Sequence, residues 1–169
     1  MKLAITDACI FIDLHLLQLT VPFFELAVEV HTSLDVFNEL NAEQQQVLSA
    51  YRSMGKLTVH IIQHEERIAI HQSGYPRALS EMDCTVLYLA SKLDAVVLSS
   101  DKAVRNYAKK NSIEYHGMLW ILDELIAQER LLSKLAAIKL RQLITGNYIY
   151  QNNAKLVSEM SKRLKIWEE

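Results

Sequence analysis

Four acidic residues lie where predicted secondary-structure elements begin or end. Asp7 and Asp101 each follow a short apolar run of the kind that forms a buried strand. Glu39 ends one predicted helix, and Asp83 lies in the first turn of another. Carboxylates gathered at one place repel one another, and a divalent cation that prefers oxygen ligands, such as Mg²⁺ or Mn²⁺, removes that repulsion. If the fold brings these four acids together, the sequence predicts a metal site.

Each acid also has a purely structural interpretation. Asp101 could cap the helix that follows it, and Asp83 with Ser80 matches the spacing of a capping box. Glu39 could be a solvated helix residue, and Asp7 could cap the next helix. Asp7 is the hardest of the four to explain in this way, because it lies between two apolar runs and a lone buried carboxylate is costly.

The elements that would position these acids alternate between strand and helix as far as residue 116. This alternation predicts βαβ units with right-handed crossovers and a mostly parallel sheet covered on both faces. At such a sheet, sites form beyond the carboxyl ends of the strands. The predicted strands are 2–6, 27–33, 57–62, 95–99 and 112–116. The predicted helices are 8–19, one beginning at Pro22, 33–40, 42–54, 64–74, 80–93 and 101–111.

The C-terminal third of the chain is predicted to be helical. Residues 118–144 are rich in leucine, Gly146 and Asn147 interrupt them, and 153–167 has the pattern of an amphipathic helix. We therefore expect a principal domain over 1–130 and a helical extension over 131–169 that packs on it. Part of the apolar surface of this region is expected to pack against a second copy or another protein, although it could also fold back entirely on its own domain.

The composition bounds the class of protein. The chain has 169 residues, of which 50% are hydrophobic, with a net charge of −2 and two cysteines. These values fit a globular protein of a reducing compartment and carry no overall signature of nucleic-acid binding. No apolar run approaches the roughly 18 residues that a membrane span needs. A cytoplasmic location without membrane attachment is therefore expected.

Four stretches of the sequence resemble the PIN domain family. They read "ITDACIFIDL", "LDVFNEL", "LSEMDCTVLYLASKLDAVVLSSDKAVRNYA" and "YHGMLWILDELI". The resemblance implies a three-layer α/β/α sandwich with a four- to five-stranded parallel sheet. It also implies an Mg²⁺- or Mn²⁺-dependent ribonuclease, and many members are toxins of toxin–antitoxin modules, usually dimeric and inhibited by a small antitoxin. The family's acidic quartet maps onto Asp7, Glu39, Asp83 and Asp101, and its serine or threonine maps onto Ser99.

These residues would share the work of metal-assisted phosphodiester hydrolysis. Asp7 and Asp101 are assigned as direct ligands, and Glu39 and Asp83 as ligands or holders of metal-bound water. Ser99 would orient a ligand or water. One departure from the family is Cys9, a weak hydrogen-bonding residue where many members carry Asn or Ser two positions after the first acid.

Acids alone would repel RNA, so cations are expected to rim the site. Lys102, Arg105 and Lys109 share one face of a predicted helix, and Arg77 lies just before another. These four are the candidate RNA-binding residues, and an ordinary solvated helix face is the alternative. A zinc site at His60 and His64 is less favoured than structural roles, because they straddle a predicted strand–helix junction.

The sequence has features of two other functions. A phosphatase of the haloacid-dehalogenase type also has an acid after its first strand, but it needs a second Asp where this chain has Cys9. A PIN-like module that has lost catalysis and binds RNA or protein stays open. Cys9 and the acidic pI favour it slightly, whereas the complete quartet opposes it.

Overall fold

The computed structural model describes all residues, 1–169, and they form two compact units. The first unit contains residues 1–12 and 27–118, and the second contains residues 13–26 and 119–169. Helix α1 (Ala8–Leu16) passes from one to the other. The four acids that are expected at the sheet edge all lie in the first unit.

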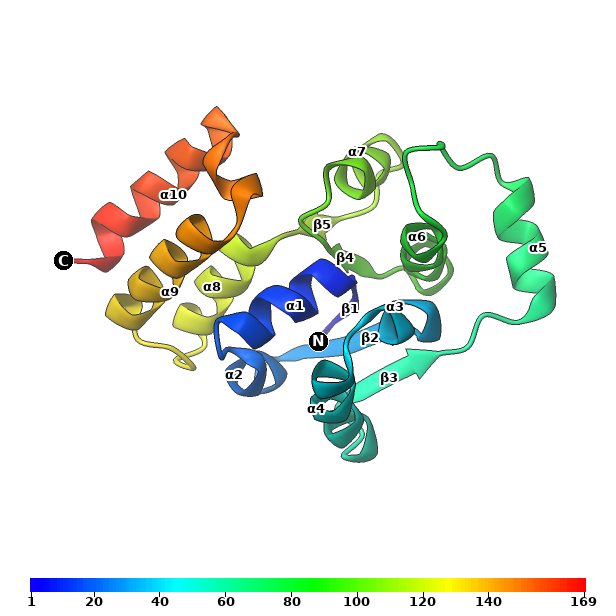
Figure 1. Cartoon of the computed structure of the whole chain (residues 1–169), viewed down its shortest axis with the longest axis horizontal. Helices are drawn as coiled ribbons and strands as arrows, with labels where there is room; N and C mark the ends of the chain where they lie inside the picture. The colour runs from blue at the N-terminus through cyan, green and yellow to red at the C-terminus, as the bar shows by residue number, and fades with distance from the viewer. The chain divides into compact units, whose positions relative to one another are not determined.

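The first unit is built on a five-stranded, all-parallel sheet of order β3-β2-β1-β4-β5 (Figure 1). This confirms the predicted fold class. Strand order reverses between β1 and β4, which makes the crevice beyond their carboxyl ends the topological switch point of the sheet. The strands are β1 (Lys2–Thr6), β2 (Val28–Ser33), β3 (Leu57–His60), β4 (Val96–Leu98) and β5 (Tyr115–His116).

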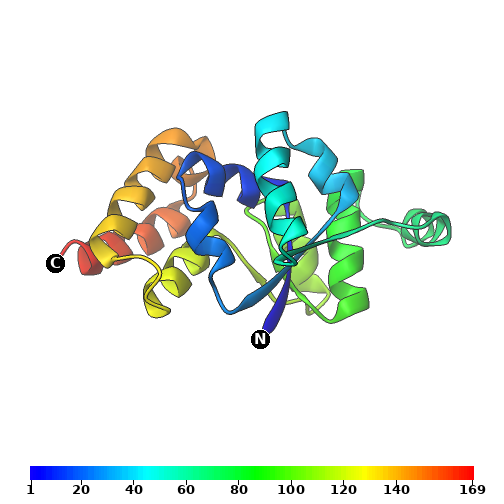
Figure 2. The same cartoon turned by 90° about the horizontal axis from the view of Figure 1, so that it is seen from below.

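Helices cover both faces of this sheet, as Figures 1 and 2 show. The connection from β2 to β3 and the connection from β4 to β5 run in opposite directions along the sheet. Because both crossovers are right-handed, the helices between β2 and β3 lie on one face and the helix between β4 and β5 lies on the other. Helix α6 packs against β1, β2 and β4. The helices of this unit are α3 (Leu34–Glu39), α4 (Ala42–Ser53), α5 (His64–Gln72), α6 (Glu81–Leu93) and α7 (Lys102–Lys110).

Burial at the centre of the sheet follows from the sequence pattern. All three residues of β4 are buried, as expected for a central parallel strand that helices cover on both sides. In β1, burial increases along the strand until Ile5 and Thr6 are completely buried. The polar residues that follow these two strands are therefore held at the edge of a buried part of the sheet.

The second unit is helical, as predicted for the tail. Its core includes Leu122, Leu125 and Leu140, which are fully buried, together with Met160. Its polar contacts include a salt bridge at 2.8 Å between the Arg163 guanidinium and the Asp123 carboxylate. The helices are α2 (Thr20–Phe24), α8 (Met118–Ala127), α9 (Ser133–Gly146), the 3₁₀ helix η1 (Tyr148–Gln151) and α10 (Ala154–Trp167).

Several predicted element boundaries were wrong, among them the end of β3, which lies at His60 rather than at residue 62. Helix α1 ends at Leu16, because Gln18 adopts a left-handed conformation with φ of 57°. Helix α2 begins two residues before Pro22, which is tolerated there because the first four N–H groups of a helix have no partner within it. Strand β5 has only two residues, because Ser112, with φ of 54°, lies in a turn at the start of the predicted strand.

Candidate active site

Asp7 lies immediately beyond the carboxyl end of β1 and is only 5% exposed. Its Oδ1 accepts a 2.8 Å hydrogen bond from the backbone N–H of Ala8, and its Oδ2 accepts a 2.8 Å bond from the hydroxyl of Ser99. Burial raises the pKa of Asp7 to about 6, opposed by the Ser99 bond and assisted by the negative charge of Asp83. A buried carboxylate with a raised pKa is the kind of group that a cation stabilises.

Ser99 connects two of the predicted site acids. It is fully buried at the end of β4. Its Oγ donates to Asp7 and accepts a 3.1 Å hydrogen bond from the backbone N–H of Asp101. The hydroxyl therefore fixes the Asp7 carboxylate relative to the start of α7.

Asp83 is electrostatically coupled to the other acids. Burial, followed by the negative charge of Asp101, raises the pKa of Asp83, while hydrogen bonds from Ser80 lower it. Because Asp83 in turn raises the pKa of Asp7, the three carboxylates lie close enough to repel one another. Three of the four acids that were predicted to converge, Asp7, Asp83 and Asp101, thus lie near one another and near Ser99.

Asp83 and Asp101 also cap helices. Asp83 Oδ2 accepts a 2.9 Å bond from the N–H of Ser80, completing a capping box, and Asp101 Oδ1 accepts a 3.1 Å bond from the N–H of Val104. Each cap uses one carboxylate oxygen. The other oxygen of each acid is left for a second partner, so the structural and the metal-binding interpretations are compatible.

Glu39 is not joined to this group. It is an exposed residue at the end of α3, and no hydrogen bond or ion pair links it to the other three acids. In the chain as a whole, no three acidic, histidine or cysteine side chains have an arrangement that could hold a metal ion. The chemistry of the three coupled carboxylates fits a hard divalent cation, although the side chains are not arranged as a ligand set.

Cys9 lies against the same carboxylate. Its Sγ is 3.6 Å from Asp7 Oδ2 and 3.7 Å from Ser99 Oγ, and it accepts a 3.4 Å hydrogen bond from the N–H of Ser100. Burial, followed by the charge of Asp7, raises the pKa of Cys9 to about 11, so the thiol stays protonated and acts as a weak donor. Cys9 therefore lies beside Asp7, where its thiol gives the carboxylate only weak hydrogen-bonding support.

The predicted basic residues differ in their surroundings. The Arg105 guanidinium lies 5.3 Å from the centre of the Tyr115 ring, a cation–π contact. Lys102, Lys109 and Arg77 are exposed. The loop that carries Arg77 is held against α7 by a ring contact between Tyr75 and Tyr107, whose centroids are 5.0 Å apart.

One cluster of contacts beside these acids carried no signal in the sequence. Arg67 of α5 donates two 3.1 Å hydrogen bonds to the carboxylate of Asp35 and a 2.9 Å bond to Glu81. These partners are 32 and 14 residues away. The bonds hold α5 beside α3 and the first turn of α6. Figure 1 shows α5 at the right-hand edge, with an extended segment at each end.

Comparison with known proteins identifies the family. A family model described as a PIN domain matches residues 3–165, and the chain therefore belongs to the PIN domain family. PIN domains are generally nucleases that bind nucleic acid and typically use divalent metals. No curated protein matches the chain.

A similar solved structure is described as "A domain of a functionally unknown protein from Methanocaldococcus jannaschii DSM 2661". It is 22% identical, with a TM-score of 0.48, over 69% of this chain and 91% of that one. Separately, none of the helices in this chain has the length and apolar character needed to cross a bilayer.

Proposed function

We propose that this protein is an Mg²⁺- or Mn²⁺-dependent endoribonuclease that hydrolyses RNA phosphodiester bonds. The observation that carries the proposal is the hydrogen-bonded chain from Asp7 through Ser99 to Asp101 at the switch point of the sheet. This arrangement holds buried negative charge that no basic side chain neutralises. The chain also belongs to a family whose members are generally nucleases.

Within this proposal the acids have different tasks. Asp7, Asp83 and Asp101 would hold the metal, which supplies an activated water and neutralises charge on the phosphate. Asp83 and Asp101 would each offer the oxygen that their helix caps leave over. Ser99 would keep Asp7 in one orientation. Glu39 would take part only by reaching in from the exposed end of α3 to hold metal-bound water.

The basic residues would hold the RNA backbone. Arg105 is the best-positioned of them, because its guanidinium is already stacked on Tyr115 and so loses little freedom on binding a phosphate. Lys102 and Lys109 would add sequence-independent attraction from the exposed face of α7, and Arg77 would do so from its loop.

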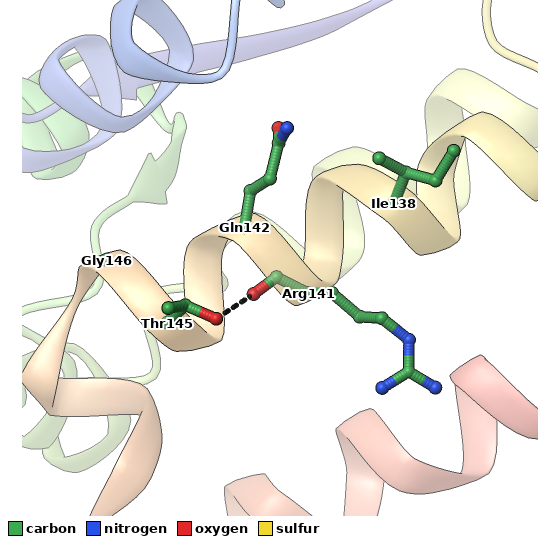
Figure 3. A pocket seen from close by; sticks show the side chains of 5 residues that line it. All are labelled: Ile138, Arg141, Gln142, Thr145 and Gly146. Atoms are coloured by element: carbon green, nitrogen blue, oxygen red, sulfur yellow. Dashed lines mark hydrogen bonds between the residues drawn. The ribbon is translucent and has the colours of Figure 1, made fainter.

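We further propose that the protein is a cytoplasmic toxin of a toxin–antitoxin module, that it dimerises, and that residues 131–169 extend a nuclease domain over 1–130. Exposed apolar side chains on α9 and at its N-cap, Leu132, support an interface with a second copy or a small antitoxin. Leu132, Leu135 and Ile138 are 79%, 41% and 53% exposed. Figure 3 shows Ile138 and Gln142 on one side of α9, with Arg141 pointing toward α10.

The competing proposal is a non-catalytic PIN-like module that binds RNA or protein. Cys9 favours it, because a thiol 3.6 Å from Asp7 supports the carboxylate less well than a hydroxyl or an amide would. Such a module would bind RNA and leave it intact.

Cleavage of a generic single-stranded RNA with Mn²⁺ separates the two proposals. The wild-type chain should cut the RNA, and Asp7→Asn should abolish cleavage while keeping the fold. Asp94→Asn is the matched control, because Asp94 is an exposed C-cap with φ of 50°, a conformation that Asn accepts readily. If the wild type binds RNA but does not cleave it, the nuclease proposal is wrong and the binding module is the better description.

A further inference from the structure

A chain of three titratable side chains crosses β2 and β3 away from the acids described above. His31 Nδ1 lies 2.8 Å from His60 Nε2, and His31 Nε2 lies 3.0 Å from the carboxylate of Glu29. His31 is only 7% exposed, and His60 is partly buried. The sequence suggested a possible pairing of His60 with His64, but the partner of His60 is 29 residues earlier in the chain.

The two imidazoles form a direct hydrogen bond. Their centroids are 5.0 Å apart and their planes are inclined by 26°, whereas the two nitrogens are separated by only 2.8 Å. The rings therefore meet edge to edge rather than face to face. A separation of this size between two nitrogens requires one proton between them.

The hydrogen-bond partners of the two rings determine which ring nitrogens carry protons. A carboxylate only accepts hydrogen bonds, so the nitrogen of His31 that faces Glu29 carries a proton. In neutral His31 the other nitrogen, Nδ1, is then bare, and the Nε2–H of His60 donates to it. The neutral chain runs from His60 through His31 to Glu29, with both ring nitrogens of His31 and Nε2 of His60 hydrogen-bonded.

Adding protons has a different effect at each step. One extra proton makes His31 a cation between Glu29 and His60, and the hydrogen bond between the rings survives because His60 can present a bare nitrogen. A second proton places two N–H groups and two positive charges against each other. The pair therefore tolerates one added proton and is broken by two.

Charged groups from two helices also face this pair. Glu66 of α5 accepts hydrogen bonds of 2.9 Å from the Tyr88 hydroxyl and 3.0 Å from the Lys92 ammonium, both on α6. Burial lowers the pKa of His60, and the charges of His31 and Lys92 lower it further, while Glu66 opposes them. The second proton is thus disfavoured in the folded state.

The histidine pair lies at a position where breaking its hydrogen bond would affect the edge of the sheet. Strand β3 is an edge strand bonded only to β2, and His60 is its last residue before the segment that leads to α5. We propose that the hydrogen bond between His31 and His60 is a pH-sensitive contact. It holds β3 to β2 near neutral pH and releases this edge of the sheet when both rings are protonated. This inference does not depend on the proposed nuclease activity.

Two measurements on the full-length chain test the proposal. Histidine proton resonances followed by NMR against pH should show His31 and His60 taking up protons in two separated steps. Amide hydrogen exchange of residues 57–60, corrected for intrinsic exchange rates, should show β3 opening more often as the pH falls from about 6.5 toward the second step. Over that range the expected increase is about tenfold per pH unit, because opening is linked to the uptake of one proton, and it should level off below the second step, where both states are protonated.

His31→Asn is the informative variant, because the Asn side-chain oxygen can still accept from His60 but cannot take a proton. In this variant His60 should titrate in one step, and the acid-dependent opening of β3 should disappear. His64→Asn, at an exposed position of α5, should behave as the wild type does. Independent titration of the two rings, or β3 exchange in the wild type that does not change with pH, would overturn the proposal even if His31→Asn fails to fold.

Discussion

The Ser99 hydroxyl donates a 2.8 Å hydrogen bond to Asp7 Oδ2 and so joins the ends of two strands that are 92 residues apart in sequence. Both residues are buried, and they directly follow β1 and β4, the neighbouring strands between which the strand order reverses. The geometry of the candidate site therefore depends on a contact that only the complete sheet can form. The first prediction addresses this bond.

Ser99→Ala should weaken both the fold and RNA cleavage. The change removes the strongest side-chain donor to a buried carboxylate and leaves the Asp101 N–H without its acceptor. We expect a loss of roughly 1–3 kcal/mol in the free energy of unfolding, measured with urea, and a lower cleavage rate with Mn²⁺. Ser91→Ala, at an exposed position of α6, is the control and should change neither. Wild-type cleavage by Ser99→Ala would show that Asp7 needs no such support.

Asp7 should make the metal-free protein less stable as the pH rises. Its pKa is raised from 3.8 to about 6, so the folded state holds the proton more tightly than the unfolded state does. The stability that it contributes is complete below about pH 4, falls as the pH rises toward 6, and stays low above that. The change amounts to at most about 3 kcal/mol. Thermal unfolding of Asp7→Asn should lack this component.

Asp13 has a similarly raised pKa of about 6, caused mainly by burial and opposed by Asn147 and Tyr150, so it adds pH dependence of the same sign. The comparison must therefore be the difference between wild type and Asp7→Asn. Below pH 6.5 the lowered pKa of His60 acts in the opposite direction, because the unfolded state then binds more protons. An identical pH dependence in the two proteins would contradict the raised pKa of Asp7.

Divalent metal should stabilise the folded protein through the same acids. Millimolar Mn²⁺ at neutral pH should raise the melting temperature of the wild type, because the cation binds the folded state and relieves repulsion among Asp7, Asp83 and Asp101. The shift should vanish in Asp7→Asn and persist in Asp94→Asn. A melting curve of the wild type that is indifferent to Mn²⁺ would count against the metal site.

Neutralising the basic face of α7 should weaken RNA binding regardless of sequence. Lys102→Gln and Lys109→Gln should each lower affinity for single-stranded RNA severalfold and reduce the salt dependence by about one phosphate contact. Fluorescence anisotropy at several salt concentrations measures both quantities. Lys165→Gln, at an exposed position in the last turn of α10, is the control. An equal effect of the control would mean that only net charge matters.

The exposed apolar side chains of α9 should mediate self-association or antitoxin binding. Leu135→Glu or Ile138→Glu should dissociate the complex, because each places a charge where apolar surface is buried. Sedimentation should then give the 19.4 kDa monomer. Val157→Glu, on α10 and 40% exposed, is the matched control and should leave association intact. A wild-type monomer at high concentration that binds no hydrophobic dye would end the interface proposal.

Local patterns in the sequence were enough to predict most of the fold. Short apolar runs alternating with capped helices identified all five strands, and Ser80 with Asp83 formed the capping box that their spacing suggested. Boundaries were less predictable where the backbone turns through a left-handed residue, as at Gln18 and Ser112, because neither is a glycine. Such conformations are imposed by tertiary packing rather than by residue type.

The candidate site was predictable in its members more than in its connections. Asp7, Ser99 and Asp101 lie together because they follow the carboxyl ends of neighbouring parallel strands, a rule that can be applied to sequence. Asp83 approaches them from the first turn of α6, whereas Glu39, which was predicted with them, stays apart. The ion pairs of Arg67 and the bond between His31 and His60 join segments 14 to 32 residues apart. Nothing local marks those contacts, since they depend on which helix the sheet places beside which strand.

The capping bonds of Asp83 and Asp101 have a consequence for the evolutionary history of chains like this one. A descendant that lost nuclease activity would still be under selection to keep both acids, because each stabilises the first turn of a helix. Asp7 differs, because its burial makes its charge costly once no cation is bound. Its replacement by a neutral residue would be the earliest trace of lost catalysis, and its presence here is more informative than that of the two capping acids.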